Sequence, residues 1–347
     1  MRDADREGPD VLSRPPQARG PGVPGPDPGR LLNGPPLLAV VGPTGTGKTA
    51  LALDLAEVLD AELIGCDALQ LYREFDVATA KPSAAERRRA PYHLVDVQDP
   101  RRDFTLARYV ALAERTLRET RRRGRQPILV GGTGMYLRGL LRGVVSAPAV
   151  DPAIRSRLKA MRERRGERAM HRWLARVDPA SAARIAPADR QRVGRALEWW
   201  VTSRTRWSDR LERSGTWADD EERFRCLKIG LDGDRDWLAA RLAARVERFF
   251  AAGLVEEVEM LMASGVSTDA NAFKAIGYRE VAEALHEGRS TDGLIERVQV
   301  ATRRYAKRQR SWFRQESGIV WLDASDSTES LRRAALDAWE AFCRGVR

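Results

Sequence analysis

The chain has 347 residues, 43% of them hydrophobic, which is enough for one large domain or two medium-sized ones with a substantial core. Its formal net charge of +11 favours a polyanionic partner, although an arginine-rich surface produced by biased codon usage explains the charge equally well. No segment is apolar enough to span a bilayer, no apolar signal core follows the start, and the three cysteines make no zinc pattern with the histidines. We therefore expect a cytoplasmic protein with reduced thiols, and neither a membrane protein nor a secreted one.

The first 36 residues are rich in Pro, Gly, Arg and Asp, a composition typical of a disordered tail. An apolar run, LLAVV, follows at 37–41 and predicts a buried strand. A helix-like stretch begins at Ala50 and ends near Leu59. The folded part of the chain is thus expected to begin at residue 37.

A phosphate-binding loop, GPTGTGKT, joins this strand to this helix. Three bare glycines let successive backbone N–H groups face one anion, and the start of the helix adds the positive end of its dipole. Lys48 supplies a charge for the terminal phosphates, and the hydroxyl of Thr49 is suited to helping hold Mg²⁺. The residues predicted to bind the polyphosphate are Gly42, Pro43, Thr44, Gly45, Thr46, Gly47, Lys48 and Thr49.

Helices then alternate with short apolar strands. AELIGCD at 61–67 and PILVGG at 127–132 read as strands, and the segment 105–123 between them reads as a helix. This alternation predicts an α/β fold with a parallel sheet flanked by helices, similar to that of P-loop NTPases.

Strand patterns are missing from residues 148–222, which are helical in pattern and rich in Arg, Ala and Trp. A strand returns at 226–232, amphipathic helices follow over 236–316, and IVWLD at 319–323 predicts a last strand. We therefore predict a core made of 37–147 and 223–325, a helical domain inserted at 148–222, and a C-terminal helix at 326–347.

Polar residues follow two of the predicted strands, where ligands gather in parallel sheets. Asp67 follows the second strand and has three readings: a helix or turn cap, a metal ligand, or a general base. Thr133 lies in the turn GGTG, which either lets a small hydroxyl approach a substrate or is an ordinary strand-to-helix turn.

Motifs of energy-coupling enzymes are absent from the sequence. The strand PILVGG ends in glycines rather than in an acid pair, and the nearest substitute acids are Asp96 and Asp99. The only asparagines, Asn33 and Asn271, do not form the Asn-Lys-x-Asp motif with which GTPases read their base. A motor or switch function is therefore disfavoured.

Two basic helical surfaces remain open to interpretation. One contains Gln191, Arg192 and Arg195, and the other is a stripe of Arg303, Lys307, Arg310 and Arg314. Such stripes are usually solvated faces, but two of them, one in an inserted domain, favour binding to an RNA backbone.

Taken together, the motifs resemble those of tRNA dimethylallyltransferases of the bacterial type, the tRNA isopentenyltransferase family. Besides the phosphate loop, the matching segments are DALQLY at 67–72, TAKPS at 79–83, PYHLVD at 91–96, DFT at 103–105, PILVGGTGMYLRGL at 127–140, QRVGRALE at 191–198, FKAIGYRE at 273–280 and TRRYAKRQRSWFR at 302–314. Together they cover nearly the whole chain after residue 36.

The resemblance implies transfer of a dimethylallyl group from dimethylallyl diphosphate to the N6 amine of the adenosine 3′ to the anticodon of tRNA, with release of diphosphate. It assigns catalysis to Asp67 as general base, Thr133 and Lys48, with Mg²⁺ as the cofactor. The partners are then the anticodon stem-loop of tRNA and dimethylallyl diphosphate, bound by a monomer. The residues that it implies for tRNA binding are Asp67, Ala68, Leu69, Gln70, Thr133, Arg155, Gln191, Arg192, Val193, Gly194, Arg195, Lys274, Ala275, Ile276, Gly277, Tyr278 and Arg279.

Three residues depart from the family pattern: Ala68 stands in place of Ser, Ala78 in place of Gly, and Tyr92 in place of His. Rival functions are a P-loop kinase of a nucleoside or small metabolite, a prenyltransferase of free adenine nucleotides, and a nucleotide-gated RNA-binding protein without chemistry.

Overall fold

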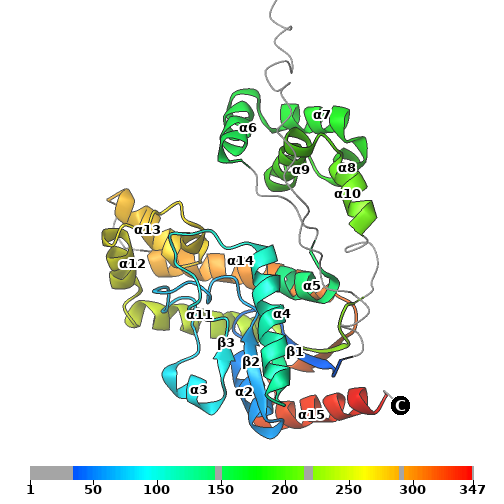
Figure 1. Cartoon of the computed structure of the whole chain (residues 1–347). Coiled ribbons are helices and arrows are strands. Elements are labelled where there is room, and N and C mark those ends of the chain that lie inside the picture. The colour runs from blue at the N-terminus through cyan, green and yellow to red at the C-terminus, as the bar shows by residue number, and fades with distance from the viewer. Residues whose placement is uncertain (1–33, 145–150, 215–221, 289–292, 346–347) are drawn as a thin grey trace, which may run out of the picture. The chain divides into compact units, whose positions relative to one another are not determined.

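The computed structural model describes residues 34–144, 151–214, 222–288 and 293–345 (Figure 1). These residues form two compact units: 151–214 make up one, and 34–144 with 222–345 make up the other. The first 33 residues of the predicted tail lie outside the described residues.

The larger unit is built on a six-stranded sheet in the order β3-β2-β4-β1-β5-β6, in which every pair of neighbours is parallel. Its strands are β1 (Leu37–Val41), β2 (Ala61–Gly65), β3 (Tyr92–His93), β4 (Gln126–Gly131), β5 (Cys226–Asp232) and β6 (Ile319–Asp323). The expected α/β fold is confirmed, and the last strand of the sequence lies at one edge of the sheet.

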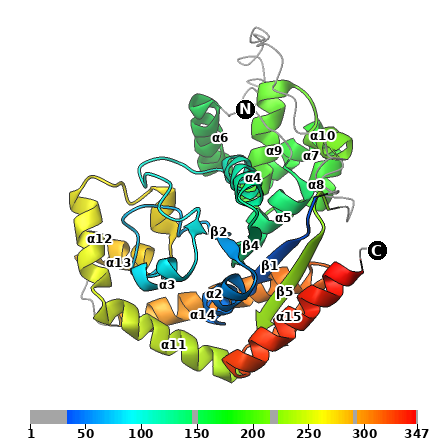
Figure 2. The same ribbon diagram turned by 60° about the horizontal axis from the view of Figure 1, so that its bottom comes forward.

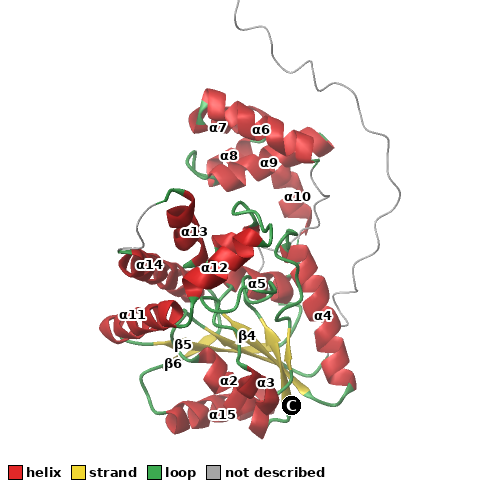
Figure 3. Cartoon of the chain, turned by 90° about the vertical axis from the view of Figure 1, so that its left-hand side faces the viewer, coloured by secondary structure: helices red, strands yellow, loops and turns green. Residues whose placement is uncertain are grey.

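Helices cover both faces of this sheet (Figures 2 and 3). Along β1, Leu37, Ala39 and Val41 point into one apolar cluster, whereas Leu38 and Val40 point into the other. Because both faces are covered, the strand is a continuous apolar run rather than an alternating one. One face packs against α2 (Lys48–Val58) and α15 (Thr328–Arg344). The other packs against α4 (Leu106–Arg122), α5 (Gly134–Arg142), α11 (Arg235–Ala251), α12 (Leu254–Ala263), α13 (Tyr278–His286) and α14 (Leu294–Arg314).

Glycines divide two stretches whose pattern is continuously helical. Gly253 has φ 88° and separates α11 from α12, and Gly166 has φ 76° and separates α6 (Pro152–Arg165) from α7 (Glu167–Val177). A residue with positive φ cannot continue a right-handed helix, so the chain turns at both places. A short helix, α3 (Ala84–Arg89), follows the TAKPS segment and begins with a capping box between Ser83 and Glu86.

The smaller unit consists of helices only: α6, α7, α8 (Pro179–Arg184), α9 (Arg190–Ser203) and α10 (Trp207–Ser214). Its core is small and includes Leu158, Met170, Leu174 and Leu197. Asp178 is buried and caps α8, accepting from the backbone and hydroxyl of Ser181 at 3.1 and 2.6 Å and from those of Ser208 at 3.0 and 2.7 Å. This one carboxylate therefore joins α8 to the start of α10.

Candidate active site

The phosphate loop follows β1 and ends where α2 begins. Gly42, Gly45 and Gly47 all have positive φ, at 135°, 87° and 88°. A Cβ atom on Gly42 would lie 2.2 Å from the backbone oxygen of Leu231, so this glycine is also required by the close approach of β5. A Cβ on Gly47 would meet nothing within 4 Å, which leaves open space beside the loop.

Lys48 is half-buried in this loop, and its Nζ donates to the carbonyl oxygen of Pro43 at 2.6 Å. Removal from water lowers the pKa of Lys48 to about 8; the charge of Asp67 opposes this shift and that of Arg245 adds to it. The positive charge of the Lys48 ammonium group is thus poorly balanced by neighbouring protein groups. An anion bound in the loop would stabilise this charged form.

Asp67 lies two residues beyond the end of β2. Its Oδ1 accepts from the backbone N–H groups of Leu69 at 2.9 Å and Gln70 at 3.4 Å, so the residue does cap a turn. Its second carboxylate oxygen makes no hydrogen bond within the described part of the chain. The capping role and a chemical role are compatible, because each uses a different oxygen.

Thr133 is held beside Asp67 by contacts between the ends of β2 and β4. Its backbone N–H donates to the oxygen of Cys66 at 3.1 Å, and its Oγ1 accepts from the N–H of Ala68 at 3.0 Å. Tyr305 of α14 lies close to Thr133, and burial raises the pKa of this phenol well above its usual value. The hydroxyl predicted to meet the substrate is therefore held by the backbone N–H of Ala68.

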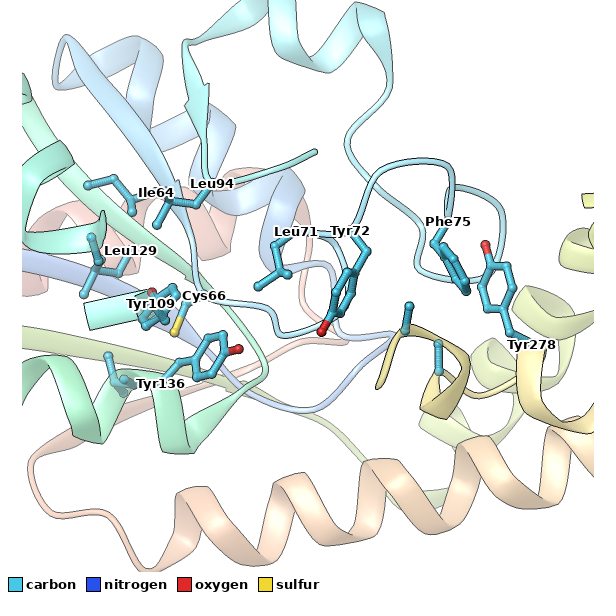
Figure 4. Packing of buried hydrophobic residues seen from close by; sticks show 14 of the residues in the cluster. Ile64, Cys66, Leu71, Tyr72, Phe75, Leu94, Tyr109, Leu129, Tyr136 and Tyr278 are labelled. Carbon is cyan, nitrogen blue, oxygen red and sulfur yellow. The ribbon is translucent and has the colours of Figure 1, made fainter. Parts of the chain in front are cut away.

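Buried aromatic residues support these strand ends (Figure 4). Cys66 lies beside Tyr109 and Tyr136, whose rings stack with centroids 4.0 Å apart. Burial raises the pKa of the Cys66 thiol to about 12, so it stays neutral. All three cysteines are free thiols, as the sequence predicts.

The loop between Asp67 and α3 is fixed by its own polar groups. Gln70 donates from Nε2 to the carbonyl oxygens of Thr79 at 3.1 Å and Ala80 at 3.0 Å. Lys81 is buried and pairs with Asp76 and Asp96, each at 2.5 Å. Asp96, considered above as a substitute for a catalytic acid, is thus used in ion pairs.

The same loop packs against α12 and α13. The Glu257 carboxylate accepts from the backbone of Asp76 at 2.8 Å and of Val77 at 3.1 Å, and from the Tyr278 hydroxyl at 2.7 Å. Figure 4 shows Phe75 facing Tyr278, with ring centroids 4.7 Å apart. Tyr278 is fully buried, so its predicted contact with tRNA would have to be indirect.

The departures from the family pattern are accommodated locally. Ala78, which replaces a usual Gly, is not among the described residues with positive φ; Ala80 is, at 46°. The N–H of Ala78 donates to the Tyr278 hydroxyl at 3.3 Å. Tyr92, which replaces a usual His, lines the cleft close to Thr49.

These elements surround one cleft of about 1090 Å³. The predicted site residues that line it are Thr44, Gly45, Gly47, Lys48, Thr49, Asp67, Leu69, Gln70, Lys274, Ala275, Ile276 and Arg279. Those of the larger unit that do not line it are Gly42, Pro43, Thr46, Ala68, Thr133, Gly277 and Tyr278. The cleft therefore joins the anion loop, a carboxylate and an amide, as expected from their positions at strand ends.

Several residues of the cleft are missing from the sequence-based predictions. Arg241, Arg245 and Arg248 form one stripe on α11, and Tyr305 and Gln309 face the cleft from α14. These three arginines are four and three residues apart, a spacing that places them on one face of a helix, so the sequence pattern could have revealed this stripe.

The basic stripe of α14 is only partly a free surface. Arg303 and Lys307 are exposed, but Arg310 and Arg314 pair with Asp232 at the end of β5, at 2.6 and 3.5 Å. Arg310 also donates to the oxygen of Gly233 at 2.7 Å. Half of this stripe thus fixes α14 to the sheet.

In the smaller unit, α9 carries the predicted residues Gln191, Arg192, Val193, Gly194 and Arg195. Val193 is buried in the core of this unit, whereas Gln191 and Arg192 are exposed. Glu198 pairs with both Arg155 at 3.0 Å and Arg195 at 3.3 Å.

Neither a metal cluster nor a membrane span is found in the part of the chain that the structure describes. No three Asp, Glu, His or Cys residues there are grouped so that they could hold a metal ion by themselves. Among these same residues, no helix combines the length and the apolar character needed to cross a bilayer.

Comparison with known proteins finds relatives that match most of this chain. The profile of a family described as IPP transferase matches residues 70–316, and one described as isopentenyl transferase matches 35–92. A tRNA dimethylallyltransferase from Geobacter metallireducens is 42% identical over 85% of this chain and 94% of its own length. One from Anaeromyxobacter dehalogenans is 46% identical over 86% of this chain and 98% of its own length.

Solved structures show the same fold. The tRNA isopentenylpyrophosphate transferase of Bacillus halodurans superposes with a TM-score of 0.65 at 33% identity, covering 89% of this chain and 98% of its own. A eukaryotic dimethylallyltransferase acting on tRNA superposes with a TM-score of 0.72 at 25% identity, covering 87% of this chain and 78% of its own. The match of the family profile to more than half of the sequence, together with these identities, shows that the chain belongs to the IPP transferase family, the family of the tRNA dimethylallyltransferases.

Proposed function

We propose that this enzyme transfers the dimethylallyl group of dimethylallyl diphosphate to the N6 amine of the adenosine 3′ to the anticodon in tRNA and releases diphosphate. The observation that carries the proposal is the single cleft that joins the phosphate loop to Asp67 and Gln70. A diphosphate and an aromatic amine bound there would be close enough to react.

The phosphate loop would stabilise the leaving group. As the allylic C–O bond breaks, negative charge grows on the diphosphate, and positive charge develops on the prenyl carbon. Backbone N–H groups at the start of α2 and the ammonium of Lys48 would stabilise the departing anion. Because the pKa of Lys48 is lowered to about 8, the bound diphosphate would also favour its charged form.

Asp67 would act as the general base. The N6 amine forms a bond to the prenyl carbon and loses one proton, which the free oxygen of Asp67 would accept. The Gln70 amide uses its Nε2 to hold the loop, so its oxygen remains to orient the adenine amine. Thr133, which does not line the cleft, would act indirectly, because its hydroxyl accepts from the N–H of Ala68 and so holds the turn that follows Asp67.

The hydroxyl of Thr49 would help to hold Mg²⁺. The residues present fit this ion, since Mg²⁺ usually keeps several waters and takes only one or two protein oxygens beside substrate phosphates. When bound, it would add positive charge beside the leaving group. Tyr92 lines the same cleft close to Thr49.

The helical unit would bind tRNA through Arg155 and the exposed residues of α9. In the larger unit, the segment from Lys274 to Arg279 and the arginines of α11 would contact the nucleotide that enters the cleft. Adenosines in loops can be turned out of the stack at modest cost, which makes such entry feasible. We further propose that the enzyme works as a monomer in the cytoplasm.

Incubation of the protein with unmodified tRNA and labelled dimethylallyl diphosphate tests this function. Label should enter tRNA only when Mg²⁺ is present. In parallel reactions to which AMP or ATP is added, label on AMP would indicate a prenyltransferase of nucleotides, and consumption of ATP would indicate a kinase. Binding of RNA without transfer of label would indicate a non-catalytic protein. Each of these outcomes would contradict the proposal.

A further inference from the structure

One buried side chain bridges the two halves of the candidate site. Gln309 of α14 is 6% exposed. Its Oε1 accepts from the backbone N–H of Thr44 in the phosphate loop at 2.9 Å, and its Nε2 donates to the backbone oxygen of Gly132 at 2.8 Å. Both ends of one amide are therefore used, each on a backbone group of a different strand end.

The fit between Gln309 and the turn GGTG is close. A Cβ atom on Gly132 would lie 2.2 Å from Nε2 of Gln309, so any side chain at 132 would displace the amide. A Cβ on Gly134 would lie 2.1 Å from Cδ1 and Nε1 of Trp312, so the indole lies directly against the start of α5. Glycine at 132 and 134 thus allows α14 to approach this turn.

Three residues of α14 at spacings of four and three contact three consecutive residues of the turn. Tyr305 lies close to Thr133, Gln309 donates to the oxygen of Gly132, and Trp312 lies against Gly134. Residues with this spacing lie on one face of a helix. Only Gln309 of the three also reaches the phosphate loop.

The hydrogen bond between Gln309 and Thr44 also determines which N–H groups of the phosphate loop can bind an anion. A backbone N–H has one hydrogen, so the N–H of Thr44 points to Gln309 and away from an anion. The remaining N–H groups and Lys48 are left to the diphosphate. Loss of the amide would free this N–H and leave the loop less precisely placed against the turn.

We infer that Gln309 is a positioning residue that sets the distance between the diphosphate cradle and the Asp67–Thr133 pair. This inference rests on the proposed function, because the two substrates are those of prenyl transfer. In-line attack needs reacting atoms almost in contact, and a misplacement of about 1 Å costs about 100-fold in rate. Gln309 acts on catalysis through the two backbone segments that it joins.

The experiment compares Gln309→Leu, Gln309→Glu and a matched control, Gln126→Leu. Gln126 also donates to backbone oxygens, those of Pro36 and Pro127 at 3.0 Å, but at the opposite end of β4. We expect Gln309→Leu to lower kcat about 100-fold with little change in the KM for tRNA. Gln126→Leu should leave kcat unchanged, and thermal unfolding should separate lost stability from lost positioning.

The variant Gln309→Glu gives a second measurement, the pH dependence of the rate, which a purely structural role of Gln309 would not change. The ionised carboxylate of Glu at this position still accepts from the N–H of Thr44, but it places a second oxygen against the oxygen of Gly132, where two acceptors repel each other. The protonated carboxyl group can instead donate to the oxygen of Gly132. The ratio of the variant's rate to that of the wild type should therefore rise as pH falls. A flat ratio would overturn the inference even if Gln309→Leu fails to fold.

Hydrogen exchange at the Thr44 amide separates this inference from the proposed function. Its protection should fall in Gln309→Leu and persist in Gln126→Leu, whichever reaction the enzyme catalyses. Unchanged protection, or a wild-type kcat in Gln309→Leu, would refute the role of Gln309. A wild-type protein that transfers no label to tRNA would instead refute the proposed function.

Discussion

The two units hold their predicted functional residues in different ways. In the larger unit, Asp67, Thr133 and the phosphate loop lie at strand ends and are fixed by hydrogen bonds to backbone. In the helical unit, the side chain of Arg192 is 71% exposed and pairs with Asp189 at 3.5 Å. Substitutions in the larger unit should therefore act on the chemical step, and those on α9 on affinity.

The largest effect is expected for Asp67→Asn. The amide keeps an oxygen that can cap the turn at Leu69 and Gln70, but it cannot accept the proton of the N6 amine. We expect kcat to fall about 10²–10⁴-fold in single-turnover assays, with tRNA binding nearly unchanged. A wild-type rate in this variant would show that Asp67 is not the base.

Asp178→Ala tests whether the helical unit unfolds independently of the larger unit. Its removal leaves donors of Ser181 and Ser208 unpaired inside the small core, which should cost about 3 kcal/mol of folding free energy.

We expect unfolding of α6–α10 at lower temperature, a higher KM for tRNA, and unchanged binding of diphosphate, measured by calorimetry. Ser330→Ala, which removes a hydroxyl from the exposed start of α15, is a control that should leave these quantities unaltered. Loss of diphosphate binding in Asp178→Ala would contradict the independence of the two units.

The pH dependence of diphosphate binding should report Lys48. Its pKa is lowered to about 8 in the free protein, so the ammonium loses its charge as pH rises through this value. The dissociation constant should therefore increase about fivefold between pH 8 and pH 9 if only the charged form binds. Lys48→Arg, whose guanidinium stays charged, should remove this dependence; the same rise in both proteins would assign it to another group.

The smallest effect is expected for Arg192→Ala. An exposed arginine that contacts a phosphate contributes modestly to affinity, so the KM for tRNA should rise several-fold while kcat stays constant. The slope of log affinity against log salt should become shallower by about one unit. A drop in kcat without a change in this slope would place Arg192 in the chemical step instead.

The sequence by itself determined the local elements and the kind of chemistry. The phosphate loop, the strands around it and the helical character of 151–214 are encoded in runs of five to about twenty residues, whose periodicity and glycine positions are sufficient to identify them. The ordered motifs also identified the family, which the comparisons confirmed. The positions of Asp67 and Thr133 after neighbouring strands predicted that they would converge.

Only the tertiary structure decided which distant groups complete the cleft. Gln309 meets Thr44 across 265 positions of sequence, and Arg245 comes to affect the pKa of Lys48 from another helix. No local pattern reveals such contacts, because they depend on how α11 and α14 pack over the sheet. The same packing decided that Arg310 and Asp96 are used in ion pairs and that Tyr278 is buried, since burial and pairing are properties of the assembled fold rather than of a segment.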